Sequence, residues 1–336
     1  MNVYNLPSTA KIEQSDRPIN TRAKLDTGTF CNYACNFCYY YDKLHEITSL
    51  DVIKERIDYI AECGMTEVDL SGGESSVHKE WFKILDYCTE KGLRISCLSN
   101  GFKFADIEFL KKSREHGLRE ILFSLHGYDE VSHDKIVGRK NAFKRMIKAI
   151  QNCHELGIIV RFNCTVTKDN FKQLDNEYVD LVNSLQPQQI NFLTLNHWDD
   201  ANKIETFSYN ESTPAIKSSI DKLNVPEIVV RYTPYCFMQG YEHYVCNTYH
   251  HIHDVKDWNI AIYNHTLDPD LYKKDPRSEL YKKANENRNM FYTKQKECLK
   301  CKYYYICDGY EKVIKEISLT PISGIKLQNL FPETFA

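Results

Sequence analysis

Between Arg22 and about Leu195, short apolar runs alternate with amphipathic stretches whose apolar residues recur every three or four positions. This alternation is typical of βα units that wind around a parallel sheet. The predicted strands are Ala23–Phe30, Glu67–Ser71, Arg94–Leu98, Arg119–Leu125, Ile158–Val166 and Gln189–Leu195. The predicted helices are Leu50–Glu62, Lys79–Lys91, Ile107–His116, Ala142–Glu155 and Phe171–Leu185.

Six strands with five intervening helices predict an α/β fold, an open or partial (β/α)6 barrel. In folds of this class the ligand site lies beyond the carboxyl ends of the strands. We therefore expect the residues that close successive strands to face one another across a common mouth. These residues are Cys31, Ser71, Asn100, His126 and Thr167.

After about His197 the sequence changes in character, because the alternation fades while aromatic residues, histidines and cysteines become dense. We predict three segments: an amino-terminal extension (1–21), the partial barrel (22–197) and a smaller second domain (198–336).

Charge and hydropathy exclude several classes of protein. The chain carries 43 Lys and Arg against 46 Asp and Glu, a net charge of −3, so nucleic acid is not expected as a partner. No apolar run approaches the roughly 18 residues of a membrane helix, and residues 1–20 lack the apolar core of a signal peptide. We therefore expect a cytoplasmic protein without a membrane partner. Its 13 cysteines should then stay reduced and serve as ligands where they cluster.

Three of these cysteines, Cys31, Cys35 and Cys38, follow the first predicted strand with Cys-x3-Cys-x2-Cys spacing. A closed zinc site or an ordinary four-iron cluster needs four protein ligands, whereas three thiolates leave one metal open to an exogenous ligand. The alternative is a zinc site that a distant Cys or His completes.

This motif resembles the signature of the radical S-adenosylmethionine (radical SAM) superfamily. The resemblance implies a [4Fe–4S] cluster on Cys31, Cys35 and Cys38, whose fourth iron is chelated by the methionine moiety of S-adenosylmethionine. It also implies that the aromatic ring of Phe37 packs by the adenine.

Further residues match the family in the expected order. Gly72, Gly73 and Glu74 resemble the Gly-Gly-Glu segment that holds the amino group of the methionine, where a carboxylate complements an ammonium. Ser124 stands where the family often contacts the ribose or the methionine carboxylate. Asn100, His126 and Asn163 are further candidates for the cofactor site, although a structural role fits each of them as well.

A second cysteine run, Cys298-x2-Cys301-x5-Cys307, lies near the carboxyl end. Its spacing alone also fits a zinc knuckle. The run resembles the first part of the twitch or SPASM domains that follow many radical SAM barrels. Since Glu311 stands near where the fuller domain adds a cysteine, we expect one auxiliary [4Fe–4S] cluster. Its expected ligands are Cys236, Cys298, Cys301 and Cys307, and Cys246 is either a packed thiol or the replacement for Cys307.

The resemblance implies an enzyme that cleaves S-adenosylmethionine reductively and uses the 5′-deoxyadenosyl radical to abstract hydrogen from its substrate. We expect a small-molecule or sugar-like substrate and an oxidoreductase or related C–H activating reaction, with flavodoxin or ferredoxin as electron donor. Glu242, Tyr241 and His126 are candidate general bases.

Two alternatives remain. The first is a maturase that crosslinks or epimerises a ribosomal peptide; such enzymes often carry a leader-binding module ahead of the barrel, and only about 30 residues precede Cys31 here. The second is a zinc-bearing regulatory or nucleic-acid-binding protein, for which the sequence lacks a basic face.

Overall fold

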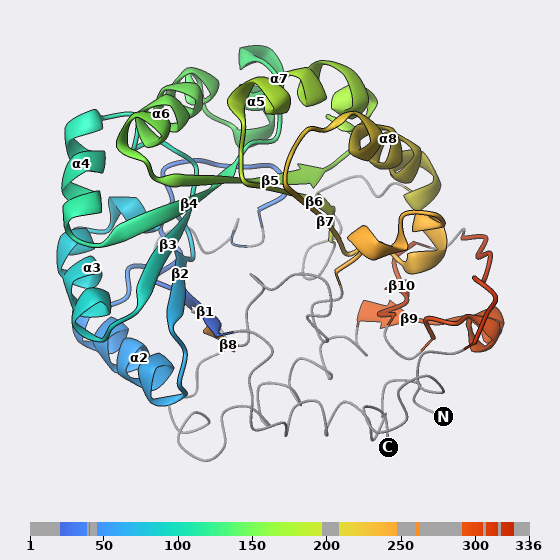
Figure 1. The fold of residues 1–336 in the computed structure, drawn as a ribbon, viewed down its shortest axis with the longest axis horizontal. Coiled ribbons are helices and arrows are strands. Elements are labelled where there is room, and N and C mark those ends of the chain that lie inside the picture. The colour runs from blue at the N-terminus through green and yellow to red at the C-terminus, as the bar shows by residue number, and fades with distance from the viewer. Residues whose placement is uncertain are drawn as a thin grey trace.

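The computed structural model describes residues 21–38, 40, 46–196, 208–246, 260–262, 291–304, 307–314 and 317–325. Within them, eight strands form one parallel sheet in the order β7-β6-β5-β4-β3-β2-β1-β8, which curls into a partial barrel (Figure 1). The strands are β1 (Arg22–Asp26), β2 (Glu67–Ser71), β3 (Arg94–Ser99), β4 (Leu118–Ser124), β5 (Ile159–Val166), β6 (Gln189–Thr194), β7 (Glu227–Arg231) and β8 (Ile260–Ile262). A separate antiparallel pair joins β9 (Tyr292–Thr293) to β10 (Tyr310–Glu311).

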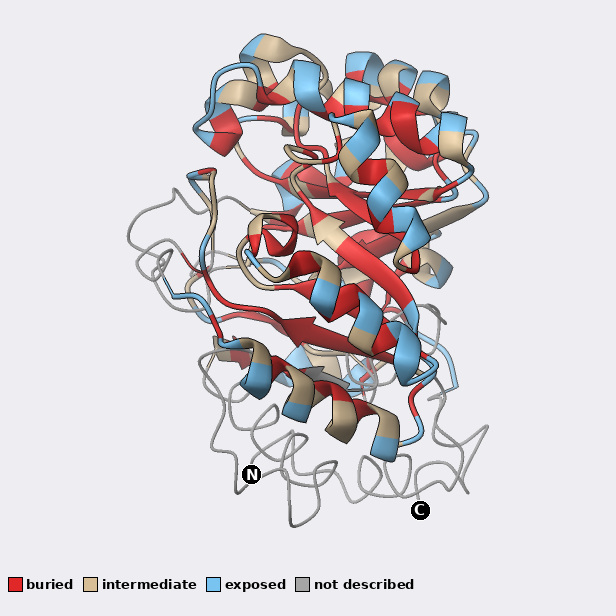
Figure 2. Cartoon of the chain, turned by 90° about the vertical axis from the view of Figure 1, so that its left-hand side faces the viewer, coloured by how far each residue is buried: buried red, intermediate tan, exposed pale blue. Residues whose placement is uncertain are grey.

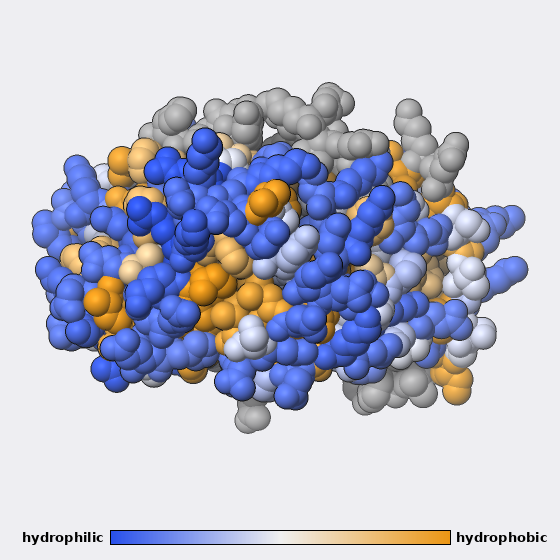
Figure 3. All heavy atoms as spheres, turned by 90° about the horizontal axis from the view of Figure 1, so that it is seen from above, coloured by the Kyte–Doolittle hydropathy of each residue, from blue (hydrophilic) through white to orange (hydrophobic). Residues whose placement is uncertain are grey.

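The helices cover the convex face of this sheet (Figure 1). They are α2 (Leu50–Glu62), α3 (Trp81–Glu90), α4 (Ile107–Glu115), α5 (Glu130–Val137), α6 (Ala142–Leu156), α7 (Val179–Leu185) and α8 (Tyr209–Lys222). Their inner sides are buried and their outer sides exposed (Figure 2). Seen from above, the surface is mostly hydrophilic, with apolar atoms in small groups (Figure 3).

The helix α2 illustrates how the sequence produces this layer. Ser49 caps its amino end by accepting a hydrogen bond from the Val52 N–H, and Ile53, Ile57 and Ile60 are buried on one stripe. The strands are covered on their outer face by such stripes, so alternate residues such as Phe123, Phe162 and Phe192 are fully buried. The main core therefore lies between the sheet and the helices.

The predicted α/β fold with a curled parallel sheet is confirmed, but the sheet has more strands than the six predicted. Both β7 and β8 come from residues 198–336, and β7 pairs with β6 in parallel. The prediction that the first strand reaches Phe30 is wrong, since β1 ends at Asp26 and the chain then turns toward the end of β2. The division into three segments stays a prediction.

Three helical regions also differ from expectation. The helices α5 and α8 were not predicted, because α5 is only about two turns long and α8 contains Pro214. The predicted helix Phe171–Leu185 is broken into a 3-10 turn (Phe171–Gln173), a π-helical turn (Leu174–Tyr178) and α7. Among the described helices, none is both long and apolar enough to cross a membrane.

Candidate active site

The three cysteines of the first motif lie on one loop that follows β1. Cys31, Cys35 and Cys38 are half-buried, and burial raises the pKa of all three thiols, that of Cys31 to about 12. The negative charges of Cys38 and Cys31 raise the pKa of Cys35 further, so the three thiols lie close enough to interact electrostatically. Backbone N–H groups donate to two of the sulfurs, from Tyr33 to Cys31 (3.5 Å) and from Tyr40 to Cys38 (3.4 Å). Positioned N–H donors to sulfur suit thiolates that bind iron.

This loop is held in place by the end of α5. The N–H groups of Ala34 and Asn36 donate to the carbonyls of Val137 (3.1 Å) and Ile136 (3.0 Å). Gly138 ends the helix with φ 63°, and a Cβ there would lie 2.5 Å from the Ala34 carbonyl oxygen. A helix that was not predicted from the sequence thus determines where the cysteine loop lies.

Gly72 and Gly73 lie against the chain that leads into the cysteine loop. Their absent Cβ atoms would each lie 2.0 Å from a carbonyl oxygen, that of Gly28 for Gly72 and that of Phe30 for Gly73. The N–H groups of Gly73 and Glu74 donate to the same two carbonyls, each at 2.9 Å. Close packing of these two loops is therefore a reason for both glycines, beside the predicted approach of a cofactor.

Glu74 is buried, and protein donors already occupy both of its carboxylate oxygens. Oε1 accepts from the hydroxyls of Ser76 (2.5 Å) and Ser99 (2.9 Å), and Oε2 accepts from the Asn100 N–H (2.7 Å). Burial raises the pKa of Glu74, while these hydrogen bonds act in the opposite direction. Glu74 therefore ties the end of β2 to the end of β3 beside the cysteine loop.

Phe37 and His126 lie together on the other side of the mouth. Their rings meet edge to face with centroids 4.8 Å apart. The Thr165 N–H donates to Nδ1 of His126 (3.1 Å), and burial, helped by His133, lowers the pKa of His126 well below 6.5. The ring is thus neutral with its proton on Nε2, so it can donate but not accept at that atom.

Ser124 and Asn163 occupy neighbouring positions on β4 and β5, and the same register continues to Asn191 on β6. The Asn191 side chain donates to Oδ1 of Asn163 (2.7 Å), and its own Oδ1 is buried without a hydrogen-bond partner. By strand alternation this row faces the concave side of the sheet, opposite Phe123 and Phe162. The row was predicted only in part, since Asn191 was missed.

Beneath this row, toward the amino ends of the strands, charged side chains fill the concave side of the sheet. Arg22 on β1 pairs with Asp69 (2.6 Å), Glu67 and Glu120 (3.5 Å). Arg161 on β5 pairs with Glu120 and with Asp69 (3.6 Å). We call this group the lumen floor; it consists of Arg22, Glu67, Asp69, Arg94, Glu120 and Arg161. The lumen floor was not predicted from the sequence, although charged residues at alternate positions of buried strands were the available signal.

Four cysteines of the carboxyl-terminal part line one pocket together with Lys294 and Tyr304: Cys236, Cys298, Cys301 and Cys307. Burial raises the pKa of Cys236 to about 12, and the negative charges of the other three thiols raise it further. The Lys294 ammonium lowers the pKa of Cys298 and of Cys307, against the larger effect of burial.

Cys246 lies outside this four-thiol pocket. It is buried, its N–H donates to the carbonyl of Val230 (2.9 Å), and it lines a neighbouring pocket with Tyr235 and Cys307. Its surroundings suit a packed thiol.

The other predicted site residues lie elsewhere. Tyr241 and Glu242 lie at the surface, where Tyr241 donates to Asp221 of α8 (2.7 Å) and Glu242 accepts from the Gly240 N–H (3.0 Å).

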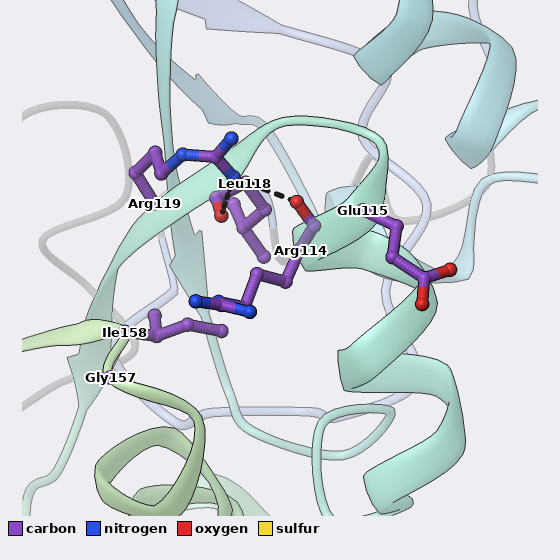
Figure 4. A pocket seen from close by; sticks show the side chains of 6 residues that line it. All are labelled: Arg114, Glu115, Leu118, Arg119, Gly157 and Ile158. Carbon is purple, nitrogen blue, oxygen red and sulfur yellow. Dashed lines mark hydrogen bonds between the residues drawn. The ribbon is translucent and has the colours of Figure 1, made fainter.

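A further pocket of about 360 Å³ opens at the amino ends of β4 and β5, away from the cysteine loop. There Arg119 donates to the carbonyls of Arg114 and Leu118, and the exposed Arg114 side chain borders the opening (Figure 4).

A single metal ion would need ligands that converge on one point. Among the described residues, no three Cys, His, Asp or Glu side chains are arranged to hold a metal ion.

Comparison with known proteins gives consistent matches. Residues 25–181 match the sequence model of the Radical SAM superfamily. The Fe-coproporphyrin III synthase of Methanosarcina barkeri is 32% identical over 197 residues, which cover 57% of this chain and 49% of that protein. The subtilosin biosynthesis protein AlbA of Bacillus subtilis is 27% identical over 161 residues, or 47% of this chain and 36% of that protein. The chain thus spans about half or less of the length of these relatives.

Among solved structures, Streptococcus suis SuiB bound to S-adenosylmethionine superposes with a TM-score of 0.65. The match covers 94% of this chain and 79% of SuiB, at 18% sequence identity. At this identity the likeness shows a shared fold.

Proposed function

Residues 25–181 match the Radical SAM superfamily, and we propose that the chain is a radical SAM enzyme whose Cys31, Cys35 and Cys38 hold its [4Fe–4S] cluster. The observation that supports this most is the cysteine loop, which presents three neighbouring thiols, with N–H donors to two of the sulfurs, at the mouth of the sheet. When bound and reduced by one electron from an external donor, the cluster and S-adenosylmethionine would supply the radical chemistry that removes a hydrogen atom from the substrate.

The residues around this loop orient the cofactor and the substrate. We assign the methionine amino group to the segment Gly72–Glu74 and the adenine side to Phe37 and His126, which pack edge to face. Ser124 and Asn163 offer polar groups on the concave side of the sheet, where they would meet the cofactor or a polar substrate. Within the lumen floor, Arg22, Asp69, Glu120 and Arg161 are buried and paired with one another, so they close the concave side of the sheet from below.

We assign the four-thiol pocket to an auxiliary [4Fe–4S] cluster. Its support is that Cys236, Cys298, Cys301 and Cys307 line one pocket while Cys246 does not. Four thiolates complete the coordination of such a cluster, so its role would be electron transfer rather than direct binding of substrate. This suits a net dehydrogenation or related C–H functionalisation of a small molecule, with flavodoxin or ferredoxin as electron donor.

A test measures iron and cofactor cleavage in anaerobically reconstituted protein. We expect about eight irons per chain, and about four after Cys31, Cys35 and Cys38 are all changed to Ala. With dithionite and S-adenosylmethionine, the wild type should release methionine and 5′-deoxyadenosine, and the triple variant should release neither. Cys63→Ala, which removes a half-buried thiol at the end of α2, is the matched control and should retain both properties. Stoichiometric zinc with little iron would contradict the proposal.

A ribosomal peptide is the second candidate substrate. It is favoured by the match to AlbA, which is named for biosynthesis of the bacteriocin subtilosin, and by the fold shared with SuiB, which was solved with a precursor peptide. The genomic neighbourhood separates the candidates. An adjacent gene for a short peptide would favour maturation, provided that the deuterium-labelled peptide transfers deuterium to 5′-deoxyadenosine. Neighbouring genes of sugar-nucleotide metabolism would favour the small molecule.

A further inference from the structure

Asn100 follows β3 and turns its side chain toward the cysteine loop. Its Nδ2 lies 3.9 Å from Sγ of Cys31, within hydrogen-bond range for sulfur, and 2.9 Å from Oδ1 of Asn32. One amide nitrogen with two hydrogens can serve both acceptors. Asn100 is half-buried, so solvent competes little for this donor.

The orientation of this amide is fixed by its other hydrogen bonds. Oδ1 of Asn100 accepts from the Phe102 N–H (3.0 Å), which closes an Asx turn. The Asn100 N–H in turn donates to Oε2 of Glu74 (2.7 Å). Because the oxygen is already occupied by the turn, the NH₂ group must face Cys31 and Asn32.

We propose that the Asn100 amide donates a hydrogen bond to the Cys31 thiolate and thereby raises the reduction potential of the cluster on the cysteine loop. Asn100 is then a positioning residue that acts through Cys31, in place of the contact with S-adenosylmethionine expected from the sequence. This inference rests on the proposed function, because it takes Cys31 as a ligand of that cluster.

The sign of the effect follows from charge. Reduction adds an electron, so the thiolates become more negative and accept hydrogen bonds more strongly, which stabilises the reduced state. The buried Glu74 carboxylate, which accepts from the Asn100 N–H, would act in the opposite direction because its charge is negative. Asn100 lies between the two groups and donates to both.

The experiment is a redox titration of the holoenzyme without S-adenosylmethionine, followed by electron paramagnetic resonance. The cluster on the cysteine loop, called the barrel cluster below, is identified by the resonance that disappears when Cys31, Cys35 and Cys38 are changed to Ala. In Asn100→Ser, which keeps an oxygen for the Phe102 N–H but removes Nδ2, we expect the ratio of reduced to oxidised cluster at fixed potential to fall about tenfold. For one electron this is a midpoint about 59 mV lower.

Two further variants complete the test. Asn32→Ala removes the competing acceptor, so the midpoint should shift in the opposite direction. Asn183→Ser removes an amide that donates to the Lys222 carbonyl (3.0 Å) rather than to a cysteine, and its midpoint should equal that of the wild type. Should Asn100→Ser fail to fold, Asn100→Asp replaces it and should also lower the midpoint.

An unchanged midpoint in a variant of Asn100 that retains the barrel cluster would overturn this inference alone. A wild-type protein without that cluster would instead overturn the proposed function, and the inference with it.

Discussion

Glu74 shows how a single buried acid can serve the architecture of a cofactor site. The sequence predicts that its carboxylate meets the methionine ammonium, and in the structure the same carboxylate accepts hydrogen bonds from Ser76, Ser99 and Asn100. A substitution at Glu74 therefore releases the end of β3 as well as any cofactor contact. Loss of cofactor affinity in Glu74→Ala would combine both effects.

The titration of Glu74 gives a prediction for stability against pH. Burial raises its pKa above 4.5, so the folded protein binds this proton more tightly than the unfolded chain. The resulting stabilisation is fully present below about pH 4.5 and is lost as the pH rises through the raised pKa. We expect the Tm of the wild type to fall relative to that of Glu74→Gln as the pH rises above about 4.5. A Tm difference that stays constant with pH would contradict this assignment.

At the scale of elements, the contact between α5 and the cysteine loop determines how the thiols are presented. Two helices end in glycines of nearly equal conformation, α5 at Gly138 (φ 63°) and α6 at Gly157 (φ 64°). A Cβ at Gly138 would lie 2.5 Å from the Ala34 carbonyl oxygen. A Cβ at Gly157 would have no atom of the described residues within 4 Å, apart from its chain neighbours and its own helix backbone. Substitutions at these two glycines therefore distinguish the effect of backbone strain, which both share, from displacement of the cysteine loop, which only Gly138 can cause.

We expect Gly138→Ala and Gly157→Ala each to cost about 1–2 kcal/mol from the left-handed backbone. Only Gly138→Ala should also lower the iron bound per chain and the yield of 5′-deoxyadenosine, because it pushes the loop that carries Cys35. Iron analysis and thermal unfolding of both variants measure this. Equal iron contents in the two proteins would show that the loop does not depend on α5.

The elements also show what a single sequence can reveal. The strands β2 to β6 and the cysteine spacing are local patterns, so they could be found by inspection of short windows. The helix α5 is short, and β7 follows α8, whose helical pattern is interrupted by Pro214, so the βα alternation was not recognised in either place. Asn191 and the lumen floor were missed because their roles depend on which strands become neighbours.

For the whole molecule, the two cysteine groups lie on different parts of the chain, and this separation can be tested. Cys298→Ala or Cys301→Ala should destroy the cluster of the four-thiol pocket, while S-adenosylmethionine is still cleaved, because Cys31, Cys35 and Cys38 are untouched. Formation of the final product should fail while 5′-deoxyadenosine still appears. Iron analysis measures the loss of the cluster, and chromatography measures 5′-deoxyadenosine and the final product separately.

Cys246→Ala is the matched control for these variants, since Cys246 is buried nearby but lies outside the four-thiol pocket. It should retain more iron than Cys236→Ala or Cys307→Ala. Iron loss in Cys246→Ala together with full retention in Cys307→Ala would replace Cys307 by Cys246 in the ligand set.

The lumen floor has a consequence for the chemistry above it. Arginines 22, 94 and 161 are matched by Glu67, Asp69 and Glu120, so the floor contributes little net field to the region of the cysteines. Ion pairs of this kind are rigid and carry no weak C–H bond or spare thiol at their facing ends. In the proposed function, the radical would therefore lie above a base of paired charges, and its substrate would approach from the opposite, open side of the sheet.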